Sequence, residues 1–392
     1  MTTHATDSST APAHARLTFA SGGWVILLAA IIVTAIAVFA LLGVVNGEKP
    51  IGDGRDPETY GFDLTSFTLP RESLVGSGNP RDFLRSLDLP ATRAGADVAP
   101  TNASERVKYA VPTDRVIGVE VNGELRAYPL RLMNVHEIVN DVLGGVPIAV
   151  TYSPLCDSAV VFDRRVGGAT LEFGVSGLLI NNNLVLYDKQ VEATGQPGAQ
   201  PTVQPSLWSQ LAFRAVAGGA ATRGEKLTII PGVEVSTWAS WFRSYPATTV
   251  ALPIDGNQRR MKEFDYERYW ADGRVNYPLV AIPPATAHDG TIPFRQINPA
   301  AAQMIEAGMS EMTMIIAVES VDGWKVLPQP VLQRLVGPPE GLADSAVLGV
   351  KAKWRIVPLR GAMIEECDEV LVMIPCRWFA WKAFHPENAV AR

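Results

Sequence analysis

A short tryptophan motif occurs twice in this chain, and it constrains the fold more than any other feature. The segments STWASWFRSYPATTV (236–250) and CRWFAWKAFHPENAV (376–390) share two tryptophans, a proline and a valine at one constant offset. The matching residues are Trp238 and Trp378, Trp241 and Trp381, Pro246 and Pro386, and Val250 and Val390. A looser similarity joins VEVNGELRAYP with VESVDGWKVLP. Such a repeat predicts two related structural units, each ending in a Trp-x-x-Trp helical turn.

Two interpretations of the four tryptophans stay open. The two members of each pair lie three residues apart, so on a helical turn they share one face. They could form an aromatic box that stacks on a ligand, which would make the protein a small-molecule binding module. Alternatively, each pair plugs the end of its own unit. Because the motif occurs in both units, we favour the structural role.

Short alternating apolar runs with turn signals predict a mainly β fold, that is, a β-rich α+β class. VIGVEVNGELRAYPL is predicted as a hairpin because Asn122-Gly123 can take the positive φ values of a tight turn. A second hairpin turns at Gly167-Gly168, and PIAVTY is apolar throughout, as in a central strand. The apolar spacing of LRLMNVHEIVNDVL predicts a helix.

The N-terminal region predicts a membrane anchor. No charged residue occurs from Trp24 to Val45, and a helix of this length can cross a bilayer core of about 30 Å. The predicted domains are therefore a cytoplasmic polar tail, a transmembrane anchor, an extended linker that packs on the surface, a first β lobe and a second, repeat-related β lobe. Their expected bounds are 1–16, 17–45, 46–110, 111–260 and 261–392.

The charge of the chain and the residues that flank the apolar run predict its partners and its localisation. The net charge is −6 and no run of lysine and arginine occurs, which argues against a nucleic-acid partner. Arg16 precedes the apolar run and mixed charges follow it, which favours an internal N-terminus. We therefore expect a single-pass protein of the cytoplasmic (inner) membrane. Its C-terminal body is expected on the periplasmic, or extracytoplasmic, side.

Three residues are candidates for chemistry: His136, Glu137 and Cys156. A helix that returns onto its following strand could bring His136 close to Cys156. Thiolate and imidazole both bind copper or zinc, so the two are candidate metal ligands. Imidazole can also increase the thiolate fraction of a nucleophilic cysteine. Either use needs a further residue, and Glu137 or Asp157 could complete the set. A buried cysteine that only fills the core is the plainer alternative.

The region from about 110 to 392 resembles DUF3179, a bacterial and archaeal family of unknown function. The resemblance rests on NVHEIVNDVLGGVPIAVTYSPLCDSAVVFDRRVGG, LEFGVSGLL, NNLVLYD and the two tryptophan segments. It implies a β-rich fold with exported or anchored members and no established activity. The family motif His-Glu followed by Cys-Pro-Leu-Cys matches His136, Glu137 and Cys156, with Ser153 at the first cysteine position. The resemblance therefore implies that a two-cysteine site is incomplete in this chain.

The leading functional expectation is an accessory or structural subunit that packs on a membrane protein complex, such as an electron-transfer or photosynthetic assembly. No cofactor is assigned. The alternatives are a metal-binding or redox enzyme that uses His136, Glu137 and Cys156, and the small-molecule binding module described above.

Overall fold

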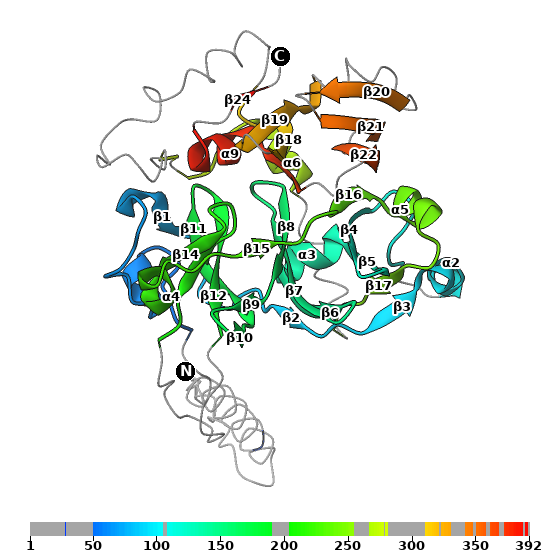
Figure 1. The fold of residues 1–392 in the computed structure, drawn as a ribbon. Helices are drawn as coiled ribbons and strands as arrows, with labels where there is room; N and C mark the ends of the chain where they lie inside the picture. Colours follow the sequence, from blue (N-terminus) through cyan, green and yellow to red (C-terminus); the bar gives the residue numbers. More distant parts are fainter. Residues whose placement is uncertain are drawn as a thin grey trace, which may run out of the picture. The chain divides into compact units, whose positions relative to one another are not determined.

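Strands dominate the part of the chain that the structure describes (Figure 1). The structure is a computed structural model. Its described residues are 50–104, 108–189, 204–254, 266–277, 279–280, 310–320, 323–330, 342–347, 350–357, 361–367, 372–386, 389–390 and Leu28. Residues from Ile51 onward group into one compact unit, distinct from residues 1–50. Within the described residues no helix has the length and apolar character needed to span a bilayer. The predicted anchor, Trp24 to Val45, lies outside them except for Leu28.

The sheet of the first repeat, here the first-repeat sheet, has the strand order β16-β4-β5-β17-β3. In that order the strands are Glu234–Thr237, Arg115–Val121, Glu124–Pro129, Thr249–Ala251 and Thr92–Ala94. The predicted hairpin is confirmed, since β4 and β5 pair antiparallel around Asn122 and Gly123, whose φ values are 50° and 81°. Helix α5, Trp238–Ser244, connects β16 to β17.

Two further sheets of five strands carry the core. The central sheet has the order β15-β8-β7-β6-β2, with strands Thr228–Ile229, Ser158–Asp163, Val146–Ser153, Ile138–Leu143 and Leu87–Asp88. The bulged sheet has the order β1-β11-β12-β13-β14, with strands Leu74–Gly76, Phe173–Ile180, Asn183–Asp188, Leu207–Ser209 and Arg214–Ala217. Strand β7 is central, as its apolar composition predicts. The pair β9, Arg165–Val166, and β10, Ala169–Thr170, turns at Gly167-Gly168 as expected.

The sheet of the second repeat, here the second-repeat sheet, has the order β23-β18-β19-β24. These strands are Met373–Arg377, Met314–Ser320, Gly323–Pro328 and Ala389–Val390, and α9, Trp378–Phe384, precedes β24. Each strand corresponds to one of β16, β4, β5 and β17. Among these corresponding strands only one pairing in each sheet is parallel, β5 with β17 and β19 with β24. The repeat thus corresponds to four strands and a helix. In sequence, the segment between β19 and β23 forms a separate three-stranded sheet. Its strands are β20 (Leu342–Val347), β21 (Val350–Val357) and β22 (Gly361–Cys367).

The prediction of one helix over LRLMNVHEIVNDVL is correct for the first half of this segment and wrong for the second. Helix α3 spans Leu130–His136, and Ile138–Leu143 form β6, which pairs with β7 along its whole length. Alternating apolar residues in a strand can also match helical spacing over a few positions, and here pairing with β7 decides the outcome.

The segment expected as a linker, residues 46–110, is part of the fold from Ile51 onward. Its strands β1, β2 and β3 pair with β11, β6 and β17, one in each of the three larger sheets. Its helical pieces are η2 (Pro57–Tyr60), η3 (Arg71–Ser73) and α2 (Gly95–Ser104). Tyr60, with no exposed surface, belongs to the main core. The many glycines and prolines of this segment make turns between short strands.

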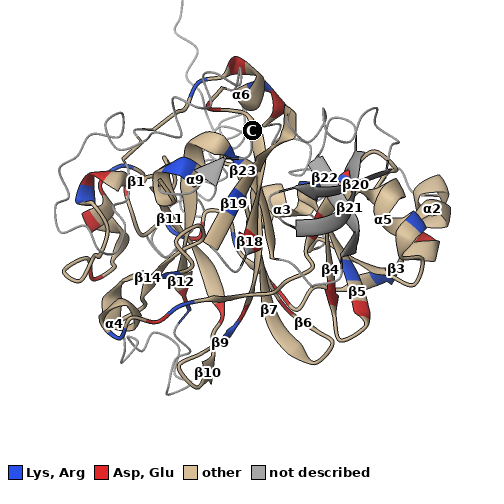
Figure 2. Cartoon of the chain, turned by 45° about the horizontal axis from the view of Figure 1, so that its top comes forward, with Lys and Arg blue, Asp and Glu red and all other residues tan. Residues whose placement is uncertain are grey.

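Charges of both signs are interleaved along the described ribbon (Figure 2). Short blue and red stretches follow one another, and no long stretch of one sign is seen along the ribbon. This pattern agrees with the absence of a basic run in the sequence. The remaining helices of the described chain are α4 (Gly218–Thr222) and α6 (Glu267–Asp272).

Candidate functional site

Glu137 lies at the junction between α3 and β6, and its backbone is unusual. Its φ is 54° and its ψ is −29°, in the left-handed region, and its N–H donates to the Met133 carbonyl at 2.7 Å. Its own carbonyl accepts from the Tyr152 N–H at 2.8 Å, which ties the junction to β7. A non-glycine residue in this region costs about 1 kcal/mol or more, and such strain is concentrated at functional sites. The junction therefore marks Glu137 as a candidate.

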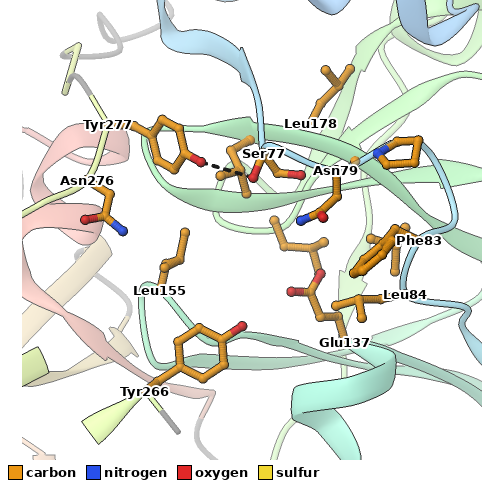
Figure 3. Close-up of a pocket in the computed structure, with 15 residues that line it drawn as sticks. Ser77, Asn79, Phe83, Leu84, Glu137, Leu155, Leu178, Tyr266, Asn276 and Tyr277 are labelled. Carbon is orange, nitrogen blue, oxygen red and sulfur yellow. Dashed lines mark hydrogen bonds between the residues drawn. The ribbon is translucent and has the colours of Figure 1, made fainter. Parts of the chain in front are cut away.

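The side chain of Glu137 faces a pocket of about 240 Å³ (Figure 3). The carboxyl group is half-buried because it faces this space, and burial raises its pKa to about 8. No hydrogen bond or ion pair to the carboxyl group is found among the described residues. The described residues that line the pocket include no lysine, arginine or histidine. A carboxyl group without a partner, in a pocket whose described lining has no basic residue, is the chemically distinctive feature of the site.

A β-bulge shapes one wall of the pocket. The register of β11 against β12 shifts between Val175 and Leu179, and Gly177 within this bulge has φ 77°. A Cβ atom at Gly177 would lie 2.7 Å from the Tyr60 ring and 2.9 Å from the Pro80 carbonyl oxygen. The Ser77 N–H donates to the Gly177 carbonyl at 3.0 Å. Glycine therefore lets residues 77–80 pass close to β11, and Ser77 and Asn79 line the pocket.

Two buried asparagines hold the segment around Tyr277, which forms another part of the pocket wall. Asn182 exchanges hydrogen bonds with the backbone of Tyr277, its amide donating at 3.2 Å and its side-chain oxygen accepting at 3.1 Å. Asn181 does the same with Val280, at 2.8 and 2.7 Å. The Tyr277 hydroxyl donates to the Ser77 carbonyl at 3.1 Å and joins the two walls. In Figure 3 the Tyr266 hydroxyl and the Glu137 carboxyl group point towards one another across the pocket.

His136 is buried beside the pocket rather than in it. Its Nδ1 lies 2.7 Å from the Arg85 carbonyl oxygen, which can only accept, so Nδ1 carries the proton. Nε2 is then a buried acceptor, and it has no hydrogen-bond partner among the described residues. Burial lowers the pKa of His136, and the Arg85 carbonyl partly opposes this. The ring is thus neutral at physiological pH.

Cys156 is also buried, and its surroundings favour the protonated thiol. Its Sγ donates to the Asn182 carbonyl at 3.1 Å, and burial raises its pKa to about 12. The thiolate needed for a nucleophile or a metal ligand is therefore disfavoured at neutral pH. No group of three or more His, Cys, Asp or Glu side chains suited to a metal ion is found in the described part of the chain. Cys376, also buried with a raised pKa, is adjacent to Arg377, whose N–H donates to the Cys156 carbonyl at 2.7 Å.

Asp157, next to the cysteine, is the centre of a buried ion-pair cluster that the sequence did not reveal. Its carboxylate accepts from Arg115 at 2.9 and 3.1 Å, from Arg377 at 3.1 Å and from the Tyr152 hydroxyl at 2.7 Å. Arg115 begins β4 of the first repeat and Arg377 ends β23 of the second. The indole of Trp270 in α6 lies 4.8 Å from the Arg377 guanidinium and donates to the Pro154 carbonyl. This turn thus connects the two repeats.

The four motif tryptophans are buried, but only the first pair lies within the core of its own repeat. Trp378 and Trp381 belong to the main core, where the Trp381 ring lies 6.4 Å from that of Phe213, between β13 and β14. Trp241 donates from Nε1 to the Thr248 hydroxyl at 2.9 Å, and its ring lies against Gly118 of β4. Trp381 stacks on His385, with ring centroids 4.2 Å apart. Trp238 and Trp378 are 5% and 3% exposed, and none of the four lines the pocket. The pocket around Glu137 therefore gives no support to the ligand-stacking interpretation of these residues.

The structure therefore separates the three residues that the sequence grouped. Glu137 faces the pocket. The His136 ring is instead hydrogen-bonded to the Arg85 carbonyl, and the Cys156 thiol to the Asn182 carbonyl. The pocket residues that sequence reasoning missed are Asn79, Tyr266, Asn276 and Tyr277. The asparagine run at 181–183 is a sequence signal that could have pointed to them. Buried side-chain amides need hydrogen-bond partners, and the backbone of another segment can supply these.

The comparisons with known proteins give a single positive result. The sequence model of one family, described as a protein of unknown function (DUF3179), matches residues 88–297. No curated protein and no solved structure matches the chain significantly. The matched region holds the first-repeat, central and bulged sheets from Asp88 onward, together with Glu137, the Asp157 turn and the described residues of α6. On this match, which covers more than half of its length, the chain belongs to the DUF3179 family.

Proposed function

We propose that the body of this protein is a small-molecule-binding module whose site is the pocket around Glu137. The observation that carries the proposal is the Glu137 carboxyl group, which faces a pocket of about 240 Å³ without a hydrogen-bond or ion-pair partner among the described residues. Burying an ionisable group without a partner is unfavourable, so a site that does so gains from a ligand that supplies one. The volume suits a compact ligand, since typical drug-sized pockets are about 300–1,000 Å³.

Binding is favoured over catalysis by the composition of the lining. Among the described lining residues Glu137 is the single carboxylic acid, and no cysteine or histidine accompanies it. Leu84, Leu155 and Leu184 contribute apolar surface, while Asn79 and Asn276 contribute amides. Apolar walls with a few placed polar groups are typical of ligand sites.

A fragment screen by ligand-observed NMR tests this proposal on the full chain in maltoside micelles. We expect fragments that bind the wild type and lose binding in Asn79→Trp, where the indole fills the pocket. Val142→Trp is the matched control, because Val142 is 43% exposed on β6 and does not line the pocket. A library in which no hit distinguishes Asn79→Trp from Val142→Trp would contradict the proposal.

We also propose that the segment Trp24 to Val45 anchors this module at the outer face of the cytoplasmic membrane, as an accessory subunit of a membrane complex. Its support is the uncharged apolar sequence, together with Arg16 ahead of it. The two-lobe division near residue 260 belongs to the same proposal, and the shared strand order of the repeats supports it. Mild-detergent extraction followed by native sizing should give a species larger than the monomer. A monomer under all extraction conditions would argue against the accessory role.

A further inference from the structure

We infer that the pocket around Glu137 takes a small organic cation, an ammonium group that carries a compact apolar substituent. This inference rests on the proposed binding function and names its ligand class. It is argued from the charge, the aromatic content and the polar groups of the lining.

The first argument is the sign of the charge. Glu137 can contribute a negative charge to the pocket, and no lysine, arginine or histidine on the described lining can offset it. The nearest imidazole, that of His136, is committed through Nδ1 to the Arg85 carbonyl, and burial lowers its pKa. A positively charged ligand therefore supplies the ion pair that Glu137 does not find within the described chain.

The second argument is the aromatic lining. Tyr266, Tyr277 and Phe83 contribute rings to the pocket, and in Figure 3 the two tyrosines lie on the side that the Glu137 carboxyl group faces. The face of an aromatic ring attracts a cation, by about 0.5–2 kcal/mol depending on desolvation. Rings and a carboxylate together are the arrangement that recognises ammonium groups, while the leucines accommodate the apolar substituent.

The third argument is the proton balance. Burial holds the pKa of Glu137 at about 8, so at pH 7 the free pocket contains mostly the neutral acid. A bound cation favours the carboxylate, so binding releases a proton, and affinity rises with pH until Glu137 is ionised without the ligand. The other ionisable side chains on the described lining are Tyr266 and Tyr277, and burial raises the pKa of Tyr266 further above neutral. Glu137 is thus the group that titrates in this range.

A neutral or anionic ligand makes the opposite prediction. The protonated Glu137 could donate a hydrogen bond to a carbonyl or a carboxylate, and that affinity would fall as pH rises. The direction of the pH dependence therefore separates the two ligand classes. The cation is favoured because the described lining has no basic residue to balance an anion.

Calorimetric titration of the full chain in maltoside micelles tests the inference with three probes. Choline and butylammonium are the cations, and 3,3-dimethyl-1-butanol is the neutral shape analogue of choline. At about pH 8.5 we expect choline to bind about tenfold more tightly than the alcohol, and its affinity to rise from about pH 6 to about pH 9. Glu137→Gln should abolish both the preference and the pH dependence. Glu120→Gln, an exposed position on β4, should keep both.

The outcomes separate this inference from the proposed function. Equal affinity for choline and the alcohol, or no binding of either cation, overturns the inference. If fragments that are neutral or anionic bind in the wild type and are lost in Asn79→Trp, the pocket is a binding site and only its ligand class was misassigned. If no fragment of any class distinguishes Asn79→Trp, the inference and the proposed function fail together.

Discussion

Glu137 and Asp157 are two acidic residues with left-handed backbones, and their surroundings are opposite. Asp157, with φ 47°, is 2% exposed and has two guanidinium groups and a phenol around its carboxylate. Glu137, with φ 54°, has a pocket in front of it and no partner among the described residues. The turn around Asp157 fixes the structure and connects the repeats, whereas the junction at Glu137 leaves a chemical group available. Strain in the backbone is common to both, so it is the presence or absence of partners that separates a structural acid from a candidate binding residue.

The largest expected effect is at the structural acid. Asp157→Asn keeps the shape and tolerates the left-handed backbone, but it leaves Arg115 and Arg377 buried without a carboxylate. We expect a loss of about 3–5 kcal/mol in the free energy of unfolding, measured by urea titration with tryptophan fluorescence. Glu58→Gln is the control, because its ion pair with Arg71 is on the surface, with side chains 65% and 43% exposed. A loss as small as that of Glu58→Gln, under about 1 kcal/mol, would show that the cluster is no stronger than a surface pair.

A pair of tyrosines sharpens the same contrast. The Tyr152 hydroxyl donates to Asp157 at 2.7 Å, and a hydrogen bond to a charged group is worth about 1.5–3 kcal/mol. Tyr152→Phe should lower the free energy of unfolding by that amount. Tyr266→Phe, which removes a hydroxyl facing the pocket, should change it by less than about 0.5 kcal/mol. Equal losses in the two variants would remove the distinction between turn and pocket.

The pH dependence of stability should reveal the Glu137 carboxyl group. Its pKa is about 8 when folded and 4.5 when unfolded, so between these values the folded state keeps a proton that the unfolded state has lost. Raising the pH through this window therefore lowers the free energy of unfolding. The full shift corresponds to about 5 kcal/mol, and we expect about 1–3 kcal/mol because solvent reaches the half-buried carboxyl group and screens its charge. Glu137→Gln should remove this decline, and Glu120→Gln should preserve it. A wild-type curve that coincides with that of Glu137→Gln would show that Glu137 titrates normally.

The smallest effect is expected at Cys156. A buried thiol with a pKa of about 12 should react with iodoacetamide only when the protein unfolds, and Cys156→Ala should cost about 1 kcal/mol. Peptide mapping by mass spectrometry at increasing urea concentrations measures the labelling. Rapid labelling of the native protein would revive the nucleophile interpretation. Stoichiometric copper or zinc that is lost in Cys156→Ala would revive the metal site with His136.

Local chemistry explains which parts of the fold could be predicted. The hairpins at Asn122-Gly123 and Gly167-Gly168 follow from residues that accept positive φ, and partners adjacent in sequence complete them. The tryptophan repeat similarly anticipates the shared order of strands, because each helical turn follows directly on β16 or β23. Where β6 begins could not be predicted, since the apolar spacing of 130–143 suits a helix and a strand, and pairing with the following strand β7 decides between them.

The candidate site was predicted only in part, for a related reason. Glu137 was singled out because of its neighbours in sequence, His136 and the later Cys156, and neither of them faces the pocket. Apart from Leu155, which precedes Cys156, the remaining lining comes from residues 77–84, 175–184 and 266–277, which no short motif connects. Their proximity depends on the bulge at Gly177 and on the amides of Asn181 and Asn182, which are tertiary features.

The pairings of β1, β2 and β3 have a consequence for how the chain can acquire its structure. These three strands are close together in sequence, but each pairs in a different sheet. The partner of β3 is β17, Thr249–Ala251, so this pairing cannot form until that later segment is present. Such long-range closure gives a high contact order and slow folding. While a ribosome is still producing the residues before β17, the early strands have unpaired edges that can associate with other chains. We therefore expect that correct folding during synthesis requires the incomplete chain to be protected from association with other chains until β3 has paired with β17.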